Sequence, residues 1–182
     1  MDFHKDRLIL SEARRYIYFT IILFVGGAVV GYAFPSRFAG LLGTIQGLAA
    51  RLVESSTPAV ILTLFLQNAS SAFIATWLGL IFGLVPLFGA LVNGIILGAV
   101  LALTGGGLMA LLSLIPHGIF ELPAIFISWG LGLWRGMWPF QGEKKKSYQE
   151  RARKAYYVFF TLVLPLLALA AIIEGVAIGL LR

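Results

Sequence analysis

Long apolar runs alternate with short polar or turn-forming segments along this chain of 182 residues. Runs of roughly twenty residues suit helices that cross about 30 Å of hydrocarbon, and none shows the two-residue alternation of an outer-membrane strand. The pattern therefore predicts an all-α membrane protein: one domain over residues 1–182, built as a bundle of about five transmembrane helices. The predicted spans cover residues 16–34, 58–82, 87–103, 119–134 and 156–181.

Two further helical segments are not expected to cross the membrane. Over residues 37–56, apolar positions recur every three or four residues, which is typical of an amphipathic helix on the membrane surface. Residues 108–115 are apolar but too short to cross, and they lead into Pro116-His117-Gly118. Because proline and glycine interrupt helices, this stretch predicts a re-entrant half-helix that ends at a break before the fourth span.

Basic residues lie beside the apolar runs rather than within them. Seven of the 14 Lys and Arg residues fall between Arg135 and Lys154. The positive-inside rule places the loop 135–155 and the basic N-terminus in the cytoplasm, and five spans then leave the C-terminus outside. Aromatic residues near the same boundary predict an inner interfacial belt; they are Trp129, Trp134, Trp138, Tyr148, Tyr156 and Tyr157.

Composition supports the membrane class and excludes several others. The chain is 59% hydrophobic and 12% charged, which is unlike an ordinary soluble domain. It has no cysteine, which excludes disulfides, thiolate metal sites and a cysteine nucleophile. The net charge of +6 lies beside the spans, where anionic lipid headgroups would meet it, so we expect the lipid bilayer and not nucleic acid as a partner.

A few polar residues interrupt the apolar spans. Both asparagines of the chain, Asn68 and Asn93, fall inside predicted spans, as does Glu174. With His117 and Glu121 they are predicted to converge on one polar seam in the middle and outer leaflet. One interpretation is that they form interhelical hydrogen bonds, worth about 0.6 kcal/mol each. The other is a site for a ligand, ion or partner, because ionisable groups within a membrane are costly.

The stretch from Pro116 to Pro123 is the most unusual of these interruptions. His117 and Glu121 are four residues apart and could hydrogen-bond on one helical turn, or Glu121 could lie in the favoured first turn of the fourth span. With Glu174 they are too few to hold a metal ion. Ser70 and Ser71 with His117 lack an orienting acid in any recognisable order. We therefore expect no metal, no cofactor and no catalysis.

Glycines spaced four apart predict close contacts between helices. Gly27 and Gly31 form such a pair in the first span, and Asn93-Gly94-x-x-x-Gly98 in the third is expected to mark the tightest crossing. Further pairs are Gly43/Gly47, Gly79/Gly83, Gly132/Gly136 and Gly175/Gly179. Packing within the chain explains them, and a homo-oligomer formed through these faces is the alternative.

Three motifs in the central part of the chain resemble one known family. They are Phe65-Leu66-Gln67-Asn68, Asn93-Gly94-x-x-x-Gly98 and Pro116-His117-Gly118-x-x-Glu121-Leu122-Pro123-Ala124. Together they resemble the stage II sporulation protein M family, and the last motif is the most specific. The resemblance implies a five-span membrane protein that, in spore-forming bacteria, acts in engulfment as an anchor for cell-wall-degrading partners. The positions carried over are Asn68, Asn93, Gly94, His117, Gly118 and Glu121.

These observations predict a non-enzymatic membrane scaffold or assembly factor, with membrane or envelope proteins as possible partners. The alternative is a small-solute or ion transporter or channel that uses the polar seam, and an intramembrane enzyme comes third. The two leading hypotheses differ in what they require of the seam. A water-filled cavity that reaches it would favour transport, whereas a dry and fully hydrogen-bonded seam would favour the scaffold.

Overall fold

The computed structural model describes residues 3–38, 40, 43, 55–79, 83–104, 108–140 and 144–180; the side chains of residues 3, 108–117 and 144–146 are outside this description. The described residues form helices joined by turns and include no strand, which confirms the all-α class. In chain order the elements are α1 (Phe3–Ala33), η1 (Pro35–Phe38), α3 (Thr57–Leu78), α4 (Leu84–Leu103), α5 (Leu108–Gly136), η2 (Trp138–Phe140), α6 (Lys144–Val158), η3 (Phe159–Val163) and α7 (Leu164–Leu180).

Four helical stretches within the described residues are long and apolar enough to span a membrane. They are His4–Ala33, Thr57–Leu78, Leu84–Leu103 and Ser147–Leu180. They overlap the predicted first, second, third and fifth spans, and the first and last of them begin earlier than predicted. The predicted fourth span, 119–134, lies within α5, which is not one of these four, so the count of five stays a prediction.

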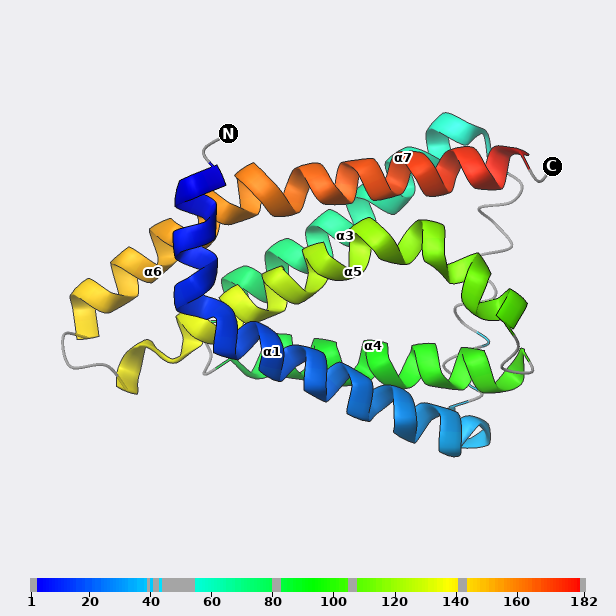
Figure 1. The fold of residues 1–182 in the computed structure, drawn as a ribbon, viewed down its shortest axis with the longest axis horizontal. Helices are drawn as coiled ribbons and strands as arrows, with labels where there is room; N and C mark the ends of the chain where they lie inside the picture. Colours follow the sequence, from blue (N-terminus) through cyan, green and yellow to red (C-terminus); the bar gives the residue numbers. More distant parts are fainter. Residues whose placement is uncertain are drawn as a thin grey trace.

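Helix α5 is the centre of the bundle. It packs against α1, α3, α4 and α7. Figure 1 shows α1 and α4 side by side along one edge and α7 along the opposite edge, with α5 between them. Although α3 and α4 are consecutive, α3 packs mainly on α5 and α7, and α4 packs mainly on α1. The two helices therefore belong to different sides of the bundle.

The predicted half-helix over 108–115 is not a separate element. Residues 108–136 form the single helix α5, which continues through Pro116, Gly118 and Pro123. Proline kinks a helix without ending it where neighbouring helices accept the freed backbone groups. Figure 1 shows the ribbon of α5 bending near its N-terminal end. The predicted surface helix over 37–56 falls almost entirely outside the described residues.

The predicted basic loop 135–155 is also partly helical. Helix α5 extends to Gly136, and α6 begins at Lys144 and continues through η3 into α7. The η3 segment is a π-helical turn, in which the Leu164 N–H donates to the carbonyl of Phe159. It ends two residues before Pro165, whose ring would clash with the Thr161 carbonyl in a regular α-helix. The wider turn lets the helix pass the proline without a break.

Glycines bring α1 and α4 into backbone contact. A Cβ placed on Gly27 or Gly31 of α1 would overlap the carbonyl of Leu91 or Ile95 of α4. Gly94 and Gly98 of α4 lie in turn against the carbonyls of Phe24 and Ala28 of α1, so each helix places its glycines on the backbone of the other. The absence of side chains at these four positions is what allows the two helices to approach so closely.

A second set of glycines joins α3 to α5. Gly79 lies against the backbone of Gly132, and Gly136 lies against the carbonyl of Gly79. On the other side of α3, Gly175 of α7 lies against Ile61. The glycine faces that the structure describes at these positions are thus occupied by contacts within the chain, and a homo-oligomer stays a prediction.

The glycine contact between α1 and α4 predicts a specific sensitivity to substitution. Gly31→Ala places a methyl group against the Ile95 carbonyl and is expected to lower the free energy of unfolding by about 1–3 kcal/mol, the usual cost of overpacking. Gly26 has nothing within 4 Å of its Cβ position, so Gly26→Ala should be neutral or stabilise by up to about 1 kcal/mol. Unfolding of both variants in mixed detergent, followed by tryptophan fluorescence, measures the difference. Equal stabilities would contradict the contact.

Candidate functional site

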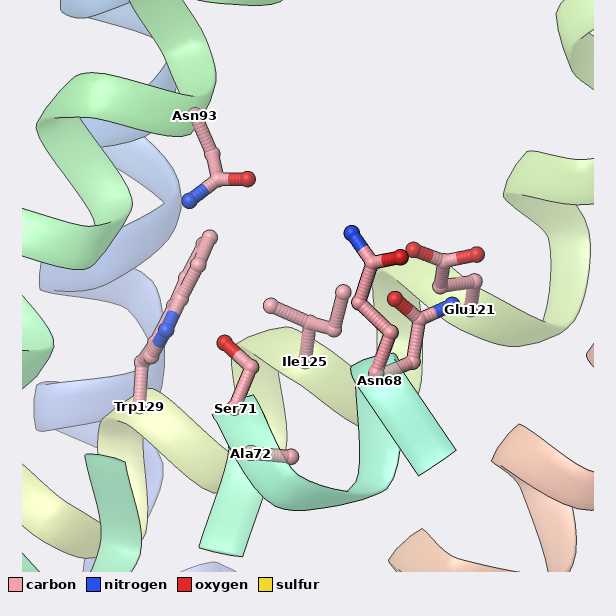
Figure 2. A pocket seen from close by; sticks show the side chains of 8 residues that line it. Asn68, Ser71, Ala72, Asn93, Glu121, Ile125 and Trp129 are labelled. Atoms are coloured by element: carbon pink, nitrogen blue, oxygen red, sulfur yellow. The ribbon is translucent and has the colours of Figure 1, made fainter. Parts of the chain in front are cut away.

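A cavity of about 190 Å³ lies between α3, α4 and α5. Its lining residues are Gln67, Asn68, Ser71 and Ala72 of α3, Asn93 of α4, and Glu121, Ile125 and Trp129 of α5 (Figure 2). Most of these side chains are polar, in contrast to the apolar composition of the three helices. The cavity is therefore the candidate functional site.

The cavity lies at the depth of the helix midpoints. Asn68 and Asn93 each stand near the middle of their helix, α3 and α4 respectively. At a rise of 1.5 Å per residue, each lies roughly 15 Å from either end of its helix. In a bilayer spanned by these helices, the polar groups are thus close to the centre of the hydrocarbon, where unsatisfied polar groups are most costly.

Two of the lining side chains are held in place by contacts with their surroundings. The Asn93 amide nitrogen Nδ2 donates to the carbonyl of Gly89, one turn earlier in α4, at 2.8 Å. Figure 2 shows the oxygen of the same amide directed toward the cavity. The ring of Trp129 packs against Phe24 and Phe126, with centroid distances of 6.2 and 5.9 Å. The indole ring forms a fixed wall of the cavity.

Glu121 contributes the carboxylate of the site. Its spacing from Ile125 and Trp129, four residues each time, places the three side chains on one face of α5. Glu121 is buried, with 7% of its surface exposed. In Figure 2 its carboxylate lies on the same side of the cavity as the Asn68 amide, and Asn93 and Trp129 lie on the other side. No lysine, arginine or histidine is among the lining residues described.

The structure brings three residues of the predicted polar seam together around one cavity. Asn68, Asn93 and Glu121 line the cavity. Glu174 lies half-buried on α7 and is not among the lining residues described. The side chain of His117 lies outside the described residues. Gly94 packs against α1, and Gly118 is a helical position of α5 whose nearest neighbour is Leu122 of the same helix, so neither glycine faces the cavity.

Five lining residues were not part of the predicted seam: Gln67, Ser71, Ala72, Ile125 and Trp129. Gln67 precedes Asn68 and was noted only as part of a motif, and Ser71 was considered only for nucleophilic chemistry. Trp129 was assigned to the inner aromatic belt, but it is 3% exposed and lines the cavity. Its position two turns after Glu121 on the same face of α5 was the available signal. A tryptophan in a membrane helix is ambiguous in sequence because both interfaces and interiors use its amphipathic ring.

A buried arginine joins three helices at the C-terminal end of α5. Arg135 is 2% exposed. Its Nη1 donates to the carbonyls of Thr76 and Trp77 of α3, at 3.3 and 3.1 Å, and to the hydroxyl of Tyr156 of α6, at 3.0 Å. The last carbonyls of a helix lack intrahelical donors and form the negative end of its dipole, so a cation is favoured there. Arg135 therefore holds the C-terminal end of α3 against α5 and α6.

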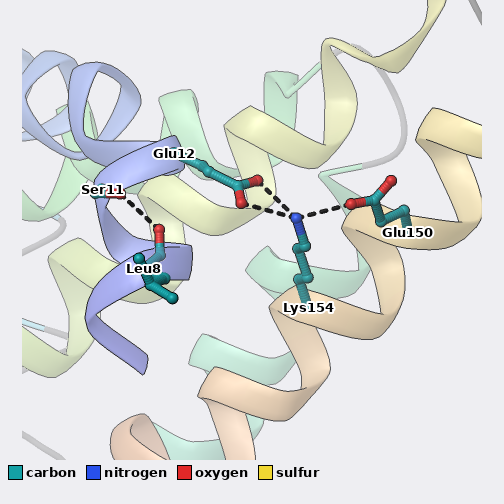
Figure 3. Close-up of polar contacts among 5 residues, drawn as sticks. All are labelled: Leu8, Ser11, Glu12, Glu150 and Lys154. Atoms are coloured by element: carbon teal, nitrogen blue, oxygen red, sulfur yellow. Dashed lines mark hydrogen bonds and ion pairs between the residues drawn. The ribbon is translucent and has the colours of Figure 1, made fainter. Parts of the chain in front are cut away.

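Ion pairs and hydrogen bonds attach the N-terminal part of α1 to the helix formed by α6 and η3. Lys154 of α6 lies 2.7 Å from Glu12 of α1 and 2.7 Å from Glu150, one turn earlier in α6 (Figure 3). Deeper in the protein, the hydroxyl of Thr161 donates to the buried carboxylate of Asp6 at 2.8 Å. These contacts position the basic helix α6 beside the start of α1.

The described side chains that could in principle bind a metal ion are not grouped into a metal centre. Within the described residues no group of three or more His, Cys, Asp or Glu side chains is placed to hold a metal ion. Glu121 is the one carboxylate among the lining residues described. The chemistry available in the cavity is hydrogen bonding, electrostatic attraction by a carboxylate, and contact with an aromatic ring.

The helices are long and apolar, and they carry large apolar side chains on the outside of the bundle. Polar side chains line a cavity between them. These features define a multi-pass membrane protein. The family model of stage II sporulation protein M matches residues 20–177. Since this match covers most of the chain, the chain belongs to the stage II sporulation protein M family, which is membrane-associated. The resemblance seen in the three central motifs is thereby confirmed. Comparison with curated proteins and with solved structures gave no significant match.

Removing the buried arginine is expected to loosen the end of α3. Arg135→Met leaves the Thr76 and Trp77 carbonyls without this donor and should lower the free energy of unfolding by about 1–3 kcal/mol. Arg153→Met, at an exposed position of α6, is the matched control and should change it by less than about 0.5 kcal/mol. Thermal unfolding in lipid nanodiscs compares the two. A loss of the same size in both variants would show that only net charge matters.

Proposed function

We propose that this chain binds a small polar solute within the membrane, as the binding step of transport, and does no chemistry on it. The observation that carries the proposal is the polar cavity of Asn68, Asn93 and Glu121 at mid-depth in the bundle. Polar groups in hydrocarbon need hydrogen-bond partners, and a cavity lined with them is stable when water or a polar solute fills it. A volume of about 190 Å³ leaves room for both.

Comparison with a hydrogen-bonded contact in the same bundle supports this interpretation. Thr76 of α3 and Ser128 of α5 join their hydroxyls at 2.7 Å, and both are fully buried, as expected for groups that hold helices together. Asn93 behaves differently. Its amide bonds to its own helix, at Gly89, and the residue is exposed. An interhelical role therefore accounts for Thr76 and Ser128 but leaves the position of Asn93 unexplained.

Access to the cavity is supported by the exposure of its rim. Gln67 and Ser71 of α3 and Asn93 of α4 are exposed, although all three line the cavity. Because α3 and α4 pack mainly on other helices, the space between them is the route by which water and solute would enter.

We further propose five crossings, with α5 as the fourth. Its 29 residues extend about 43 Å at 1.5 Å per residue, enough to cross the hydrocarbon. In this arrangement the N-terminus and the basic segment 135–155 face the cytoplasm, as the positive-inside rule requires, and the C-terminus lies outside.

A scaffold or assembly role is the second candidate, and family membership favours it. The end of the bundle at which Lys154 bridges Glu12 and Glu150 would present a fixed basic helix to membrane or envelope partners. Such a role does not use the cavity. The scaffold and the solute-binding proposal therefore predict different properties of the cavity lining.

Thiol labelling tests whether water reaches the cavity, and the absence of cysteine makes single-cysteine variants clean reporters. In liposomes, the Ser71→Cys variant should react with a charged, membrane-impermeant methanethiosulfonate, because an aqueous cavity permits the reactive thiolate. Leu66→Cys is the control: it is also exposed on α3 but is not among the lining residues, and a thiol in lipid stays protonated and unreactive.

The labelling rates, measured by mass spectrometry, separate the two candidates. Labelling of the Ser71→Cys variant alone supports solute binding. If neither variant reacts, the cavity is dry, the solute-binding proposal fails and the scaffold becomes the better explanation.

A further inference from the structure

We propose that the N-terminal segment of α1, residues 3–15, binds the headgroup of an anionic phospholipid. The binding surface is its basic face, formed by the exposed residues Arg7, Ser11, Arg14 and Arg15. None of these residues is among those described around the cavity, so lipid binding here goes beyond the proposed solute binding and does not depend on it.

The N-terminal segment of α1 is held across one end of the bundle. Figure 1 shows the first turns of α1 turned away from the direction of the rest of the helix, which runs beside α4. The buried residues Ile9 and Ala13 pack in one cluster with Leu131 of α5 and Ala155 of α6. One side of the segment is therefore fixed against the protein, and the basic face is left exposed on another side.

Contacts with α6 and η3 separate the acidic residues of the segment from the basic ones. Asp6 is 3% exposed and accepts a hydrogen bond from the hydroxyl of Thr161 at 2.8 Å. Both carboxylate oxygens of Glu12 accept from Lys154, at 2.7 and 2.9 Å (Figure 3). These contacts use both acidic residues that the structure describes in the segment. The basic face is left with three arginines and no carboxylate of its own, so it attracts anions.

Helical spacing brings the three arginines together. Arg7, Arg14 and Arg15 fall within about 100° around the helix axis, and Ser11 lies between them. Arg15 donates to the hydroxyl of Tyr16 at 2.8 Å. A guanidinium group has further N–H donors, and their fork matches two oxygens of one phosphate. The basic face is thus suited to a ligand that carries a phosphate.

The basic face continues along α1 as an apolar face, which favours a phospholipid over a soluble anion. Beyond Arg15 the exposed residues on this side are Tyr18, Ile22, Val25 and Val29. They belong to the stretch His4–Ala33, which is long and apolar enough to span a membrane. Arg14 precedes Tyr18 by only about 6 Å along the helix. A phospholipid can place its phosphate on the arginines and its chains on the apolar face, whereas a soluble anion uses the arginines alone.

Lipid titration of the purified 182-residue chain in detergent, followed by native mass spectrometry, measures the binding. Phosphatidylglycerol and phosphatidylcholine both carry a phosphate, but only phosphatidylglycerol has a net negative charge. We expect the first phosphatidylglycerol to bind more tightly than the first phosphatidylcholine. Arg14→Gln should weaken phosphatidylglycerol binding about fivefold, and Arg7→Gln combined with Arg14→Gln about 25-fold, because each arginine near an anionic headgroup contributes a factor of about five.

Arg37→Gln is the matched control for Arg14→Gln. Arg37 is also an exposed arginine, but it belongs to η1, beyond the opposite end of α1. The substitution removes the same charge and should leave the affinity for phosphatidylglycerol unchanged. Binding of phosphatidylcholine should be the same in all of these variants.

Thermal unfolding in the same detergent gives a second measurement. A lipid that binds only the folded chain raises the unfolding temperature. Phosphatidylglycerol should raise it in the original chain and in Arg37→Gln, and much less in the variant that lacks both Arg7 and Arg14. Inorganic phosphate at the same ionic strength should not replace the lipid, because it has no chains to place on the apolar face.

Three results would overturn the inference. Equal affinities for the two lipids would show that the headgroup charge is not recognised. An equal loss in Arg14→Gln and Arg37→Gln would show that only the net charge of the chain matters. Stabilisation by inorganic phosphate as large as that by phosphatidylglycerol would show that the ligand is a free anion. None of these results bears on solute binding, which the labelling of the Ser71→Cys variant tests separately.

Discussion

Close backbone approach at glycine is the contact on which the rest of this bundle depends. Lipid supplies no hydrophobic drive for helices to associate, so packing must come from surfaces that fit at short range. Gly27 and Gly31 of α1 interleave with Gly94 and Gly98 of α4, and a similar contact joins Gly132 of α5 to Gly79 beside α3. These contacts set which helices are partners.

The cavity is a consequence of that partnership. The turn between α3 and α4 includes Gly83, whose φ of +70° is a conformation that side chains disfavour. Beyond this turn α4 pairs with α1, whereas α3 pairs with α5 and α7. Toward the C-terminal end of α5, Arg135 and the Thr76–Ser128 hydrogen bond close the contact between α3 and α5. Nearer the middle of the helices, polar side chains line the space that remains.

Polar residues within the spans divide into two groups. Thr76 and Ser128 bond to each other and are buried, and Arg135 is held by carbonyls and a tyrosine hydroxyl. Asn68, Asn93 and Glu121 surround a cavity instead. In sequence, Asn93 was singled out as a polar residue within a span and Arg135 was assigned to the basic loop, but their roles follow from the groups that each contacts. The first group stabilises the bundle, and the second lines the cavity on which the proposed function rests.

The sequence alone determined the membrane class, the all-helical fold and four of the spans, because run length and hydropathy are local properties set by the bilayer. It also singled out Asn68, Asn93 and Glu121, since polar groups are rare in lipid. Only the tertiary structure decided that Trp129 is a cavity wall and not part of a belt, and that α5 passes through Pro116. Those outcomes depend on which helix packs against which, and that is set by contacts between residues far apart in the chain.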